Sequence, residues 1–230
     1  LDVVPNPWQA ARIMMEAIDA LNKKGHTEEV IFNNRLYLLD SIKRSLKKQV
    51  HELSEKVFMG KLKGGEITFR LITSGNENMN FEIAQELRVM ARKNERKLRQ
   101  ANNDPVTNSL FEIVFEKDLN NLAKDFALYL SGQEAVYWWH RMVARQDYGL
   151  QGWQKNKVYP DFIACLNKKR LMVLETKGLQ LKGNDDTEYK TRLFDLLTTH
   201  YQEAIKAGTI ELSGDADTPV SLHMLMEDSW

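Results

Sequence analysis

Residues 159–178 constrain the fold more than any other stretch, because two apolar segments are joined there by a short charged turn. The first segment is Tyr-Pro-Asp-Phe-Ile-Ala-Cys-Leu, and the second is Leu-Met-Val-Leu-Glu-Thr-Lys-Gly. Apolar runs of this length that end at turn residues are typical of strands. The four residues from Asn167 to Arg170 form a turn short enough for a hairpin. The stretch therefore predicts two paired strands.

Three charged residues fall at particular positions of this predicted hairpin. Asp161 lies at the start of the first strand, whereas Glu175 and Lys177 lie at the end of the second. Successive side chains of a strand point to opposite faces, so Glu175 and Lys177 point the same way and Thr176 the other. In a hairpin the start of one strand lies beside the end of its partner. We therefore expect two carboxylates and an ammonium to meet at one end of the sheet.

This grouping has a chemical use. Two neighbouring carboxylates repel, and one of them is driven to take up a proton unless a cation lies between them. Oxygen ligands suit Mg²⁺ or Mn²⁺. A lysine beside such an ion can orient or deprotonate a water, or stabilise charge that develops on a phosphate. The alternative is a surface hairpin in which Glu175 and Lys177 form a simple salt bridge.

The residues of the hairpin also resemble a known signature. Pro160-Asp161 followed by Glu175-Thr176-Lys177 resembles the motif of the PD-(D/E)xK nuclease superfamily. The flanking residues look most like the C-terminal endonuclease domain of type III restriction subunits and related helicase-linked nucleases. Trp153-Gln154-Lys155-Asn156 resembles a stretch of the same domains, so the likeness covers roughly residues 131–208.

The resemblance implies a metal-dependent DNA endonuclease domain from a restriction-type helicase-nuclease. It implies Mg²⁺ as cofactor, with Mn²⁺ as a substitute, and DNA as substrate. Its implied partners are a helicase or ATPase domain that precedes this one in the parent chain and a methyltransferase or specificity subunit. The alternative is a catalytically inactive nuclease-like module that serves DNA binding or subunit assembly. A second alternative, a purely helical interaction domain, predicts no ordered site at 159–178.

The implied site residues fall into three groups. The catalytic group is Asp161, Glu175 and Lys177. The metal ligands are Asp161, Glu175, Thr176 through its carbonyl, and Glu134, which lies on a predicted helix before the sheet. For Glu134 the alternative is a solvent-facing glutamate favoured by the dipole at a helix N-terminus. The candidate DNA contacts are Lys190, Arg192 and Lys155, although Lys190 and Arg192 could equally be an ordinary exposed pair.

The patterns around the hairpin predict an α/β (α+β) fold. We expect a mainly helical accessory or docking region with one strand at 1–105, then at 106–230 a restriction-endonuclease-like core in which helices flank a small mixed sheet. The polar stretch Ala101-Asn102-Asn103-Asp104-Pro105 is the candidate boundary. The predicted helices are 7–23, 39–57, 81–100, 108–129, 133–145 and 187–207, and the other predicted strands are 67–71 and 220–226.

Two of these helices carry patterns with more than one interpretation. Residues 39–57 have an apolar stripe near heptad spacing, which fits half of a coiled coil or, more simply, one helix that faces a core. The basic side chains of helix 81–100 could contact a phosphate backbone or could simply be solvated. Asn6 is the predicted N-cap of the first helix, and Thr187 or Asp186 is the predicted N-cap of the helix that comes after the hairpin.

The composition excludes several classes of protein. The formal net charge is zero, so overall basicity does not indicate a nucleic-acid partner, although basic residues predominate in 43–63, 86–100 and 151–192. A single cysteine, Cys165, allows no disulfide within the chain and favours a reducing cytoplasm. We find no apolar run long enough for a membrane span, no signal peptide and no P-loop. The start Leu-Asp-Val-Val suggests a fragment of a longer protein, and processing would look the same.

Overall fold

The structure is a computed structural model that describes residues 3–67, 95–111, 113–145, 147, 149–154, 157–167, 170–206 and 220–230, with the backbone alone over 201–206. The predicted strand 67–71, apart from its first residue, and the predicted helix 81–100 before residue 95 lie outside these ranges. The chain divides into two compact units, 1–68 with 153–155, and 69–152 with 156–230. The expected boundary at 105 thus falls inside the second unit.

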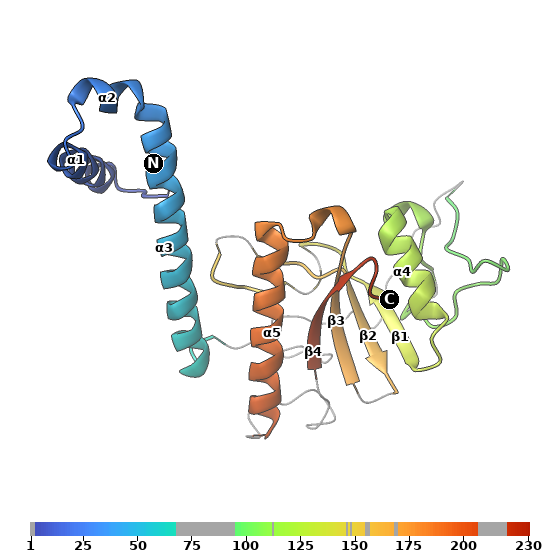
Figure 1. Cartoon of the computed structure of the whole chain (residues 1–230). Helices are drawn as coiled ribbons and strands as arrows, with labels where there is room; N and C mark the ends of the chain where they lie inside the picture. The colour runs from blue at the N-terminus through green and yellow to red at the C-terminus, as the bar shows by residue number, and fades with distance from the viewer. Residues whose placement is uncertain are drawn as a thin grey trace. The chain divides into compact units, whose positions relative to one another are not determined.

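Three helices build the first unit: α1 (Pro7–Lys23), α2 (Glu28–Asn33) and α3 (Arg35–Lys63) (Figure 1). Asn6 caps α1 as predicted, because its side-chain oxygen accepts a hydrogen bond from the backbone N–H of Trp8 at 3.0 Å. Proline at the first helical position needs no hydrogen-bond partner for its nitrogen, which suits the start of a helix. The local sequence is therefore sufficient to explain where α1 begins.

The apolar stripe of α3 does not face a core. Leu53 and Val57 are 62% and 57% exposed, and Phe58 and Leu62 are the buried residues of this helix. The short helix α2 packs against α3, and six residues cannot cover a helix of 29. The interpretation of α3 as a core-facing helix is therefore wrong for most of its length.

A four-stranded mixed sheet forms the second unit, in the order β1 (Val136–Arg141), β2 (Phe162–Leu166), β3 (Arg170–Lys177) and β4 (Val220–Met226). The pairs β1–β2 and β2–β3 are antiparallel, and β3–β4 is parallel. The predicted hairpin is confirmed as β2–β3, and the predicted last strand as β4 at the sheet edge. An ordered sheet at 159–178 also rules out the purely helical alternative.

Helices flank this sheet, so the chain has an α/β fold with a helical N-terminal part. They are α4 (Asn121–Ser131) and α5 (Asp185–Lys206), with short 3₁₀ turns at Glu116–Asp118 and Leu179–Leu181. Along the described part of the second unit, the helices and strands follow in the order α4, three strands, α5 and β4 (Figure 1). A crossover through α5 is what a parallel β3–β4 pair requires.

The two faces of the sheet bury different sets of side chains. Trp139, Phe162 and Leu174 pack with α4 residues such as Phe126 in one apolar cluster. The Trp139 indole N–H donates to Asn108 at 3.1 Å and to Ser131 at 3.0 Å, which satisfies its polar atom inside the core. Because side chains alternate, the residues next to Phe162 and Leu174 in each strand point to the other face. α5 packs against β4.

One predicted helix is a strand. Residues 133–145 were expected to form a helix, on which Glu134, Trp138 and Arg141 would share one face. The structure instead has β1 at Val136–Arg141, paired with β2. Its sequence Val-Tyr-Trp-Trp-His-Arg is rich in residues that favour strands, and pairing with β2 outweighs the weak helical periodicity.

Two other predicted helices are wrong in part. Residues 95–100 are extended rather than helical, and Lys97 and Arg99 form isolated bridges with Phe115 and Pro105. Leu98 is buried as expected, but in the α4 cluster. The helix predicted at 108–129 begins only at Asn121, because the Asn120 side chain caps it there by accepting from the Ala123 N–H at 2.8 Å. Within the described residues, no helix is long and apolar enough to cross a membrane.

Candidate active site

The register of the β2–β3 hairpin brings the two predicted acids together. Phe162 lies opposite Leu174, so the next pair outward is Asp161 and Glu175. The backbone N–H of Asp161 donates to the carbonyl of Leu174, the partner of Phe162, at 2.9 Å, so the regular pairing ends at Phe162. Alternation directs Glu175 to the face opposite Leu174, whereas the Asp161 carboxylate contacts Arg141 and Thr176; its negative charge still acts on Glu175. The hairpin thus brings Asp161 and Glu175 to the same end of the sheet, and the convergence of their two side chains on one ligand stays a prediction.

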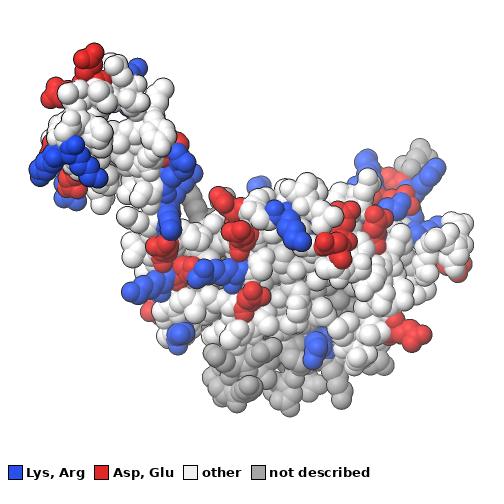
Figure 2. Space-filling view, in the orientation of Figure 1, with Lys and Arg blue, Asp and Glu red and all other residues white. Residues whose placement is uncertain are grey.

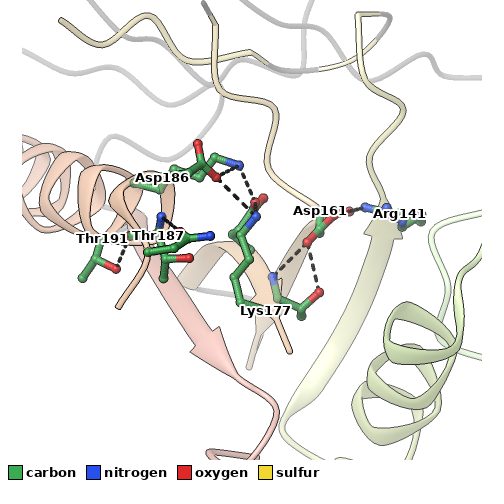
Figure 3. Close-up of polar contacts among 10 residues, drawn as sticks. Arg141, Asp161, Lys177, Asp186, Thr187 and Thr191 are labelled. Atoms are coloured by element: carbon green, nitrogen blue, oxygen red, sulfur yellow. Dashed lines mark hydrogen bonds and ion pairs between the residues drawn. The ribbon is translucent and has the colours of Figure 1, made fainter. Parts of the chain in front are cut away.

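Asp161 is held by groups from two strands. One carboxylate oxygen, Oδ1, accepts from Arg141 Nη1 at 2.8 Å. The other, Oδ2, accepts from the Thr176 N–H at 2.9 Å and from the Thr176 hydroxyl at 3.0 Å. Figure 3 shows Arg141 and Asp161 facing each other at the ends of β1 and β2. These bonds fix the carboxylate rotamer.

Glu175 lies in a more confined environment. It is only 3% exposed, and one of its oxygens, Oε1, accepts from Lys190 at 2.8 Å and lies 3.1 Å from Lys177 Nζ. The other oxygen, Oε2, is buried and has no hydrogen-bond partner among the described residues. A buried carboxylate oxygen without a partner is costly, so this atom is available to a cation or a hydrogen-bond donor.

Asp186 completes the cluster from the first turn of α5. Its Oδ2 lies 3.6 Å from Lys177 Nζ and 3.4 Å from Lys190 Nζ. Figure 3 shows Lys177 between Asp161 and Asp186. The two lysines therefore join an acid on β3 to an acid on α5.

Burial and charge shift the acidity of two groups here. Burial, and secondly the negative charge of Asp161, raise the pKa of Glu175 against the opposing effect of the two lysines. Burial by itself lowers the pKa of Lys190, but the Glu175 carboxylate and then Asp186 outweigh it, so that pKa is raised. Lys190 is therefore a cation at neutral pH, whereas the Glu175 carboxylate is destabilised in the absence of a further cation.

The first turn of α5 is fixed by a residue that the sequence patterns did not single out. The Asn184 side chain accepts from the Thr187 N–H at 2.8 Å, so Asn184 is the cap rather than Thr187 or Asp186. This cap begins α5 one residue before Asp186. One turn later Lys190 lies on the same helix face as Asp186, which is why both reach the sheet end.

Glu134 does not join the site. It is exposed and precedes β1, whose first residue Val136 pairs with Leu166 at the far end of β2 from Asp161. The Ala135 carbonyl accepts from the Asn167 N–H at 2.9 Å, which fixes this segment beside the hairpin turn. Glu134 was predicted as a ligand on the assumption that residues 133–145 form a helix. Because β1 is a strand that runs the length of β2, its start, next to Glu134, lies at the opposite end of the sheet from Asp161.

The candidate DNA contacts separate in the structure. Lys190 is half-buried in the Glu175 cluster, whereas Arg192 is exposed on α5. Lys155 lies outside the described residues. Thr176 is buried and contacts Asp161 through its N–H and hydroxyl. The proposed role of its carbonyl stays a prediction.

Two residues of the cluster, Arg141 and Asp186, were missed. Arg141 lies opposite Phe162, next to Asp161, and this register is apparent only once β1 is recognised as a strand. Asp186 precedes Lys190 by four residues, which is the spacing of a helical ion pair. That spacing was readable in the sequence.

None of the family models, curated proteins or solved structures compared with the chain matches it. A function for the chain must therefore be inferred from the geometry and charge of the cluster.

The residues of the cluster fit a hard divalent ion. No group of three or more His, Cys, Asp or Glu side chains arranged for a metal occurs in the described part of the chain. Mg²⁺ does not need one, because it is often held by one or two carboxylates and completes its octahedron with waters and substrate phosphates. Glu175 offers such a donor in its unpartnered Oε2, and Asp161 is near enough for its charge to act on Glu175.

The face of the second unit in view in Figure 2 has no single-sign charge patch. Basic and acidic side chains are interspersed over its described residues. The formal net charge of the whole chain is zero.

Proposed function

We propose that the second unit is a metal-dependent endonuclease domain that hydrolyses phosphodiester bonds in DNA. The single observation that carries the proposal is the paired carboxylates Asp161 and Glu175, with an unpartnered oxygen on Glu175 and Lys177 on the same carboxylate. Burial and the charge of Asp161 disfavour the Glu175 carboxylate although two lysines pair with it, and a divalent ion would offset this. The resemblance of Pro160-Asp161 and Glu175-Thr176-Lys177 to the PD-(D/E)xK signature, and the order of helix, three strands, helix and strand, support the same interpretation.

Asp161 and Glu175 would hold Mg²⁺, or Mn²⁺ in its place. The bound ion would lower the pKa of a water and offset negative charge on the phosphate. The bonds from Arg141 and Thr176 keep Asp161 oriented, and Lys190 keeps Glu175 oriented. Burial of Glu175 excludes bulk water from that side of the site.

Lys177 would act on the reacting phosphate. Its ammonium lies 3.1 Å from Glu175, so it can donate to a phosphate oxygen or to the attacking water beside that carboxylate. In hydrolysis the water oxygen bonds to phosphorus, the bond from phosphorus to one sugar oxygen breaks, and that oxygen takes up a proton. A preorganised cation is worth most where charge develops in this transition state.

A specific observation favours the alternative of a nuclease-like module without catalysis, used for DNA binding or subunit assembly. Arg141 pairs with Asp161, and both lysines pair with Glu175, so each acid already has a cationic partner. An inactive descendant of a nuclease could keep such pairs for stability alone.

A divalent-ion titration separates the two functions. The full chain and its Asp161→Ala variant are titrated with Mn²⁺ in a calorimeter and assayed for cleavage of plasmid and short linear DNA in Mg²⁺ and Mn²⁺. The endonuclease proposal expects binding and cleavage by the parent chain and loss of both in the variant. If the parent chain binds no ion and leaves DNA intact, the module without catalysis is the correct function. The helicase domain and the methyltransferase or specificity subunit remain proposed partners.

A further inference from the structure

A cavity of about 520 Å³ lies against the edge strand β1, on the side away from β2. Its walls come from residues 109–111, 113–115, 118 and 119, and from residues 139–144. The first segment is held along β1 by backbone bonds, in which the Trp139 carbonyl accepts from the Leu110 N–H at 2.7 Å. The volume lies within the roughly 300–1,000 Å³ that is typical of small-ligand sites.

The cavity shares a wall residue with the proposed active site. Arg141 lines the cavity, and its guanidinium donates to Asp161 at 2.8 Å. Met142, another lining residue, donates its backbone N–H to the Asp161 carbonyl at 2.9 Å. A group in the cavity would therefore lie one side chain away from the acid that is proposed to hold the metal.

The lining suits a flat heterocycle. Most of the walls are apolar, and they include Phe111, whose ring meets that of His140 with centroids 5.2 Å apart at 77°. The Nε2 atom of His140 lies 3.0 Å from Oδ2 of Asp147, and the same oxygen accepts a hydrogen bond from the Val143 N–H at 2.8 Å. These contacts fix the His140 ring. Apolar walls with a few oriented polar groups are the usual form of a ligand site, and a nucleobase combines a flat apolar face with a polar edge.

We propose that this cavity receives one unpaired nucleobase of the DNA strand whose phosphate lies at Asp161 and Glu175. The inference rests on the proposed endonuclease function and specifies its substrate class. A base in a duplex is stacked and paired, so it can enter such a cavity only after leaving the stack. The preferred substrate would then be a strand that already has an unpaired base next to the cut, such as a single strand, a flap or an overhang.

The test measures binding without cleavage, in Ca²⁺, with the full chain. Short single strands carry 2-aminopurine, a fluorescent base, at successive positions, and matched strands carry an abasic site at the position that responds. Three variants are compared with the parent chain. Phe111→Ala removes the aromatic wall, Val143→Trp fills the cavity from its exposed rim, and Tyr137→Ala removes an exposed aromatic of β1 outside the cavity.

We expect one 2-aminopurine position to change its fluorescence on binding, and the abasic strand to bind about tenfold more weakly than the intact strand. Each of the variants Phe111→Ala and Val143→Trp should bind the intact strand about tenfold more weakly than the parent chain does. Neither substitution should weaken binding of the abasic strand much further. This non-additivity is the mark of a direct contact. Tyr137→Ala should match the parent chain, and duplex of the same sequence should bind more weakly than single strand.

Several outcomes would overturn the proposal. The cavity is not a base site if intact and abasic strands bind equally, or if the two cavity variants weaken both strands to the same degree. A free mononucleotide that competes as strongly as the strand would make it a nucleotide site instead. Cleavage in Mg²⁺ without any base effect leaves the endonuclease function standing and removes this inference. A base effect with no cleavage in Mg²⁺ or Mn²⁺ retains the base site and refutes the nuclease function.

Discussion

The two ends of the β2–β3 hairpin each have a glutamate nearby, in very different surroundings. At one end Glu175 is 3% exposed, pairs with two lysines and lies beside Asp161. At the other end Glu134 is exposed before β1, next to the turn at Asn167. Burial and a neighbouring acid raise the pKa of Glu175. Burial and neighbours, rather than residue type, therefore make an acid a candidate ligand.

The largest expected effect is at Glu175. Glu175→Ala should reduce Mg²⁺-dependent DNA cleavage below detection and weaken Mn²⁺ binding, because it removes the only carboxylate oxygen of the site that is buried without a partner in the described structure. The measurements are single-turnover cleavage and calorimetry, with circular dichroism to verify the fold. Unchanged cleavage would show that Glu175 is not a metal ligand, and the two ends of the hairpin would then not differ in function.

Lys177→Ala should lower the cleavage rate on the order of a hundredfold, by analogy with the loss of one transition-state donor. DNA affinity in Ca²⁺ should change far less, because the ammonium lies within the cluster, 3.1 Å from Glu175. Lys177→Arg should also be impaired, since guanidinium does not replace a compact ammonium. Lys182→Ala, an exposed lysine five residues later, is the matched control. If affinity and rate fell in proportion, Lys177 would be only a phosphate contact.

Glu175→Gln should raise the melting temperature of the metal-free protein at pH 7.5. The pKa of Glu175 is raised above its ordinary value of 4.5, so the folded state binds the proton more tightly than the unfolded state. The protonated Glu175 side chain therefore adds to the free energy of unfolding below about pH 4.5, and this contribution is lost as the pH rises through the raised pKa of Glu175. Each kcal/mol gained in the free energy of unfolding raises the melting temperature by roughly 2–4 °C in a domain of this size.

The difference in melting temperature between Glu175→Gln and the parent chain should therefore shrink as the pH falls from 7.5 towards 4.5. Thermal melts in chelator across this range measure it. A lower melting temperature for Glu175→Gln at every pH would mean that pairing with Lys177 and Lys190 outweighs the cost of burying the carboxylate.

The smallest expected effect is at the other end of the hairpin. Glu134→Ala should leave cleavage, Mn²⁺ affinity and melting temperature within experimental error of the parent chain, because the side chain is exposed and remote from Asp161. The same three measurements apply. A loss of metal binding would show that the two ends are not distinct in function.

Local patterns predicted much of the fold around the site. The β2–β3 hairpin was predicted from two apolar runs and a short turn, and Asn6 predicted the start of α1. β1 was mistaken for a helix, because a short aromatic run fits both periodicities and only pairing with β2 decides between them. The apolar stripe of α3 predicted a core that the first unit does not provide.

The amino-acid order alone was enough to place Asp161, Glu175 and Lys177 at one sheet end, because alternation and hairpin register are properties of neighbouring residues. Long-range packing was needed to bring Arg141 to Asp161 and to close Lys190 and Asp186 over Glu175. These groups come from β1 and α5, which reach the hairpin through contacts over long sequence separations. The burial that shifts the acidity of Glu175 depends on the same packing, and a one-dimensional pattern does not contain it.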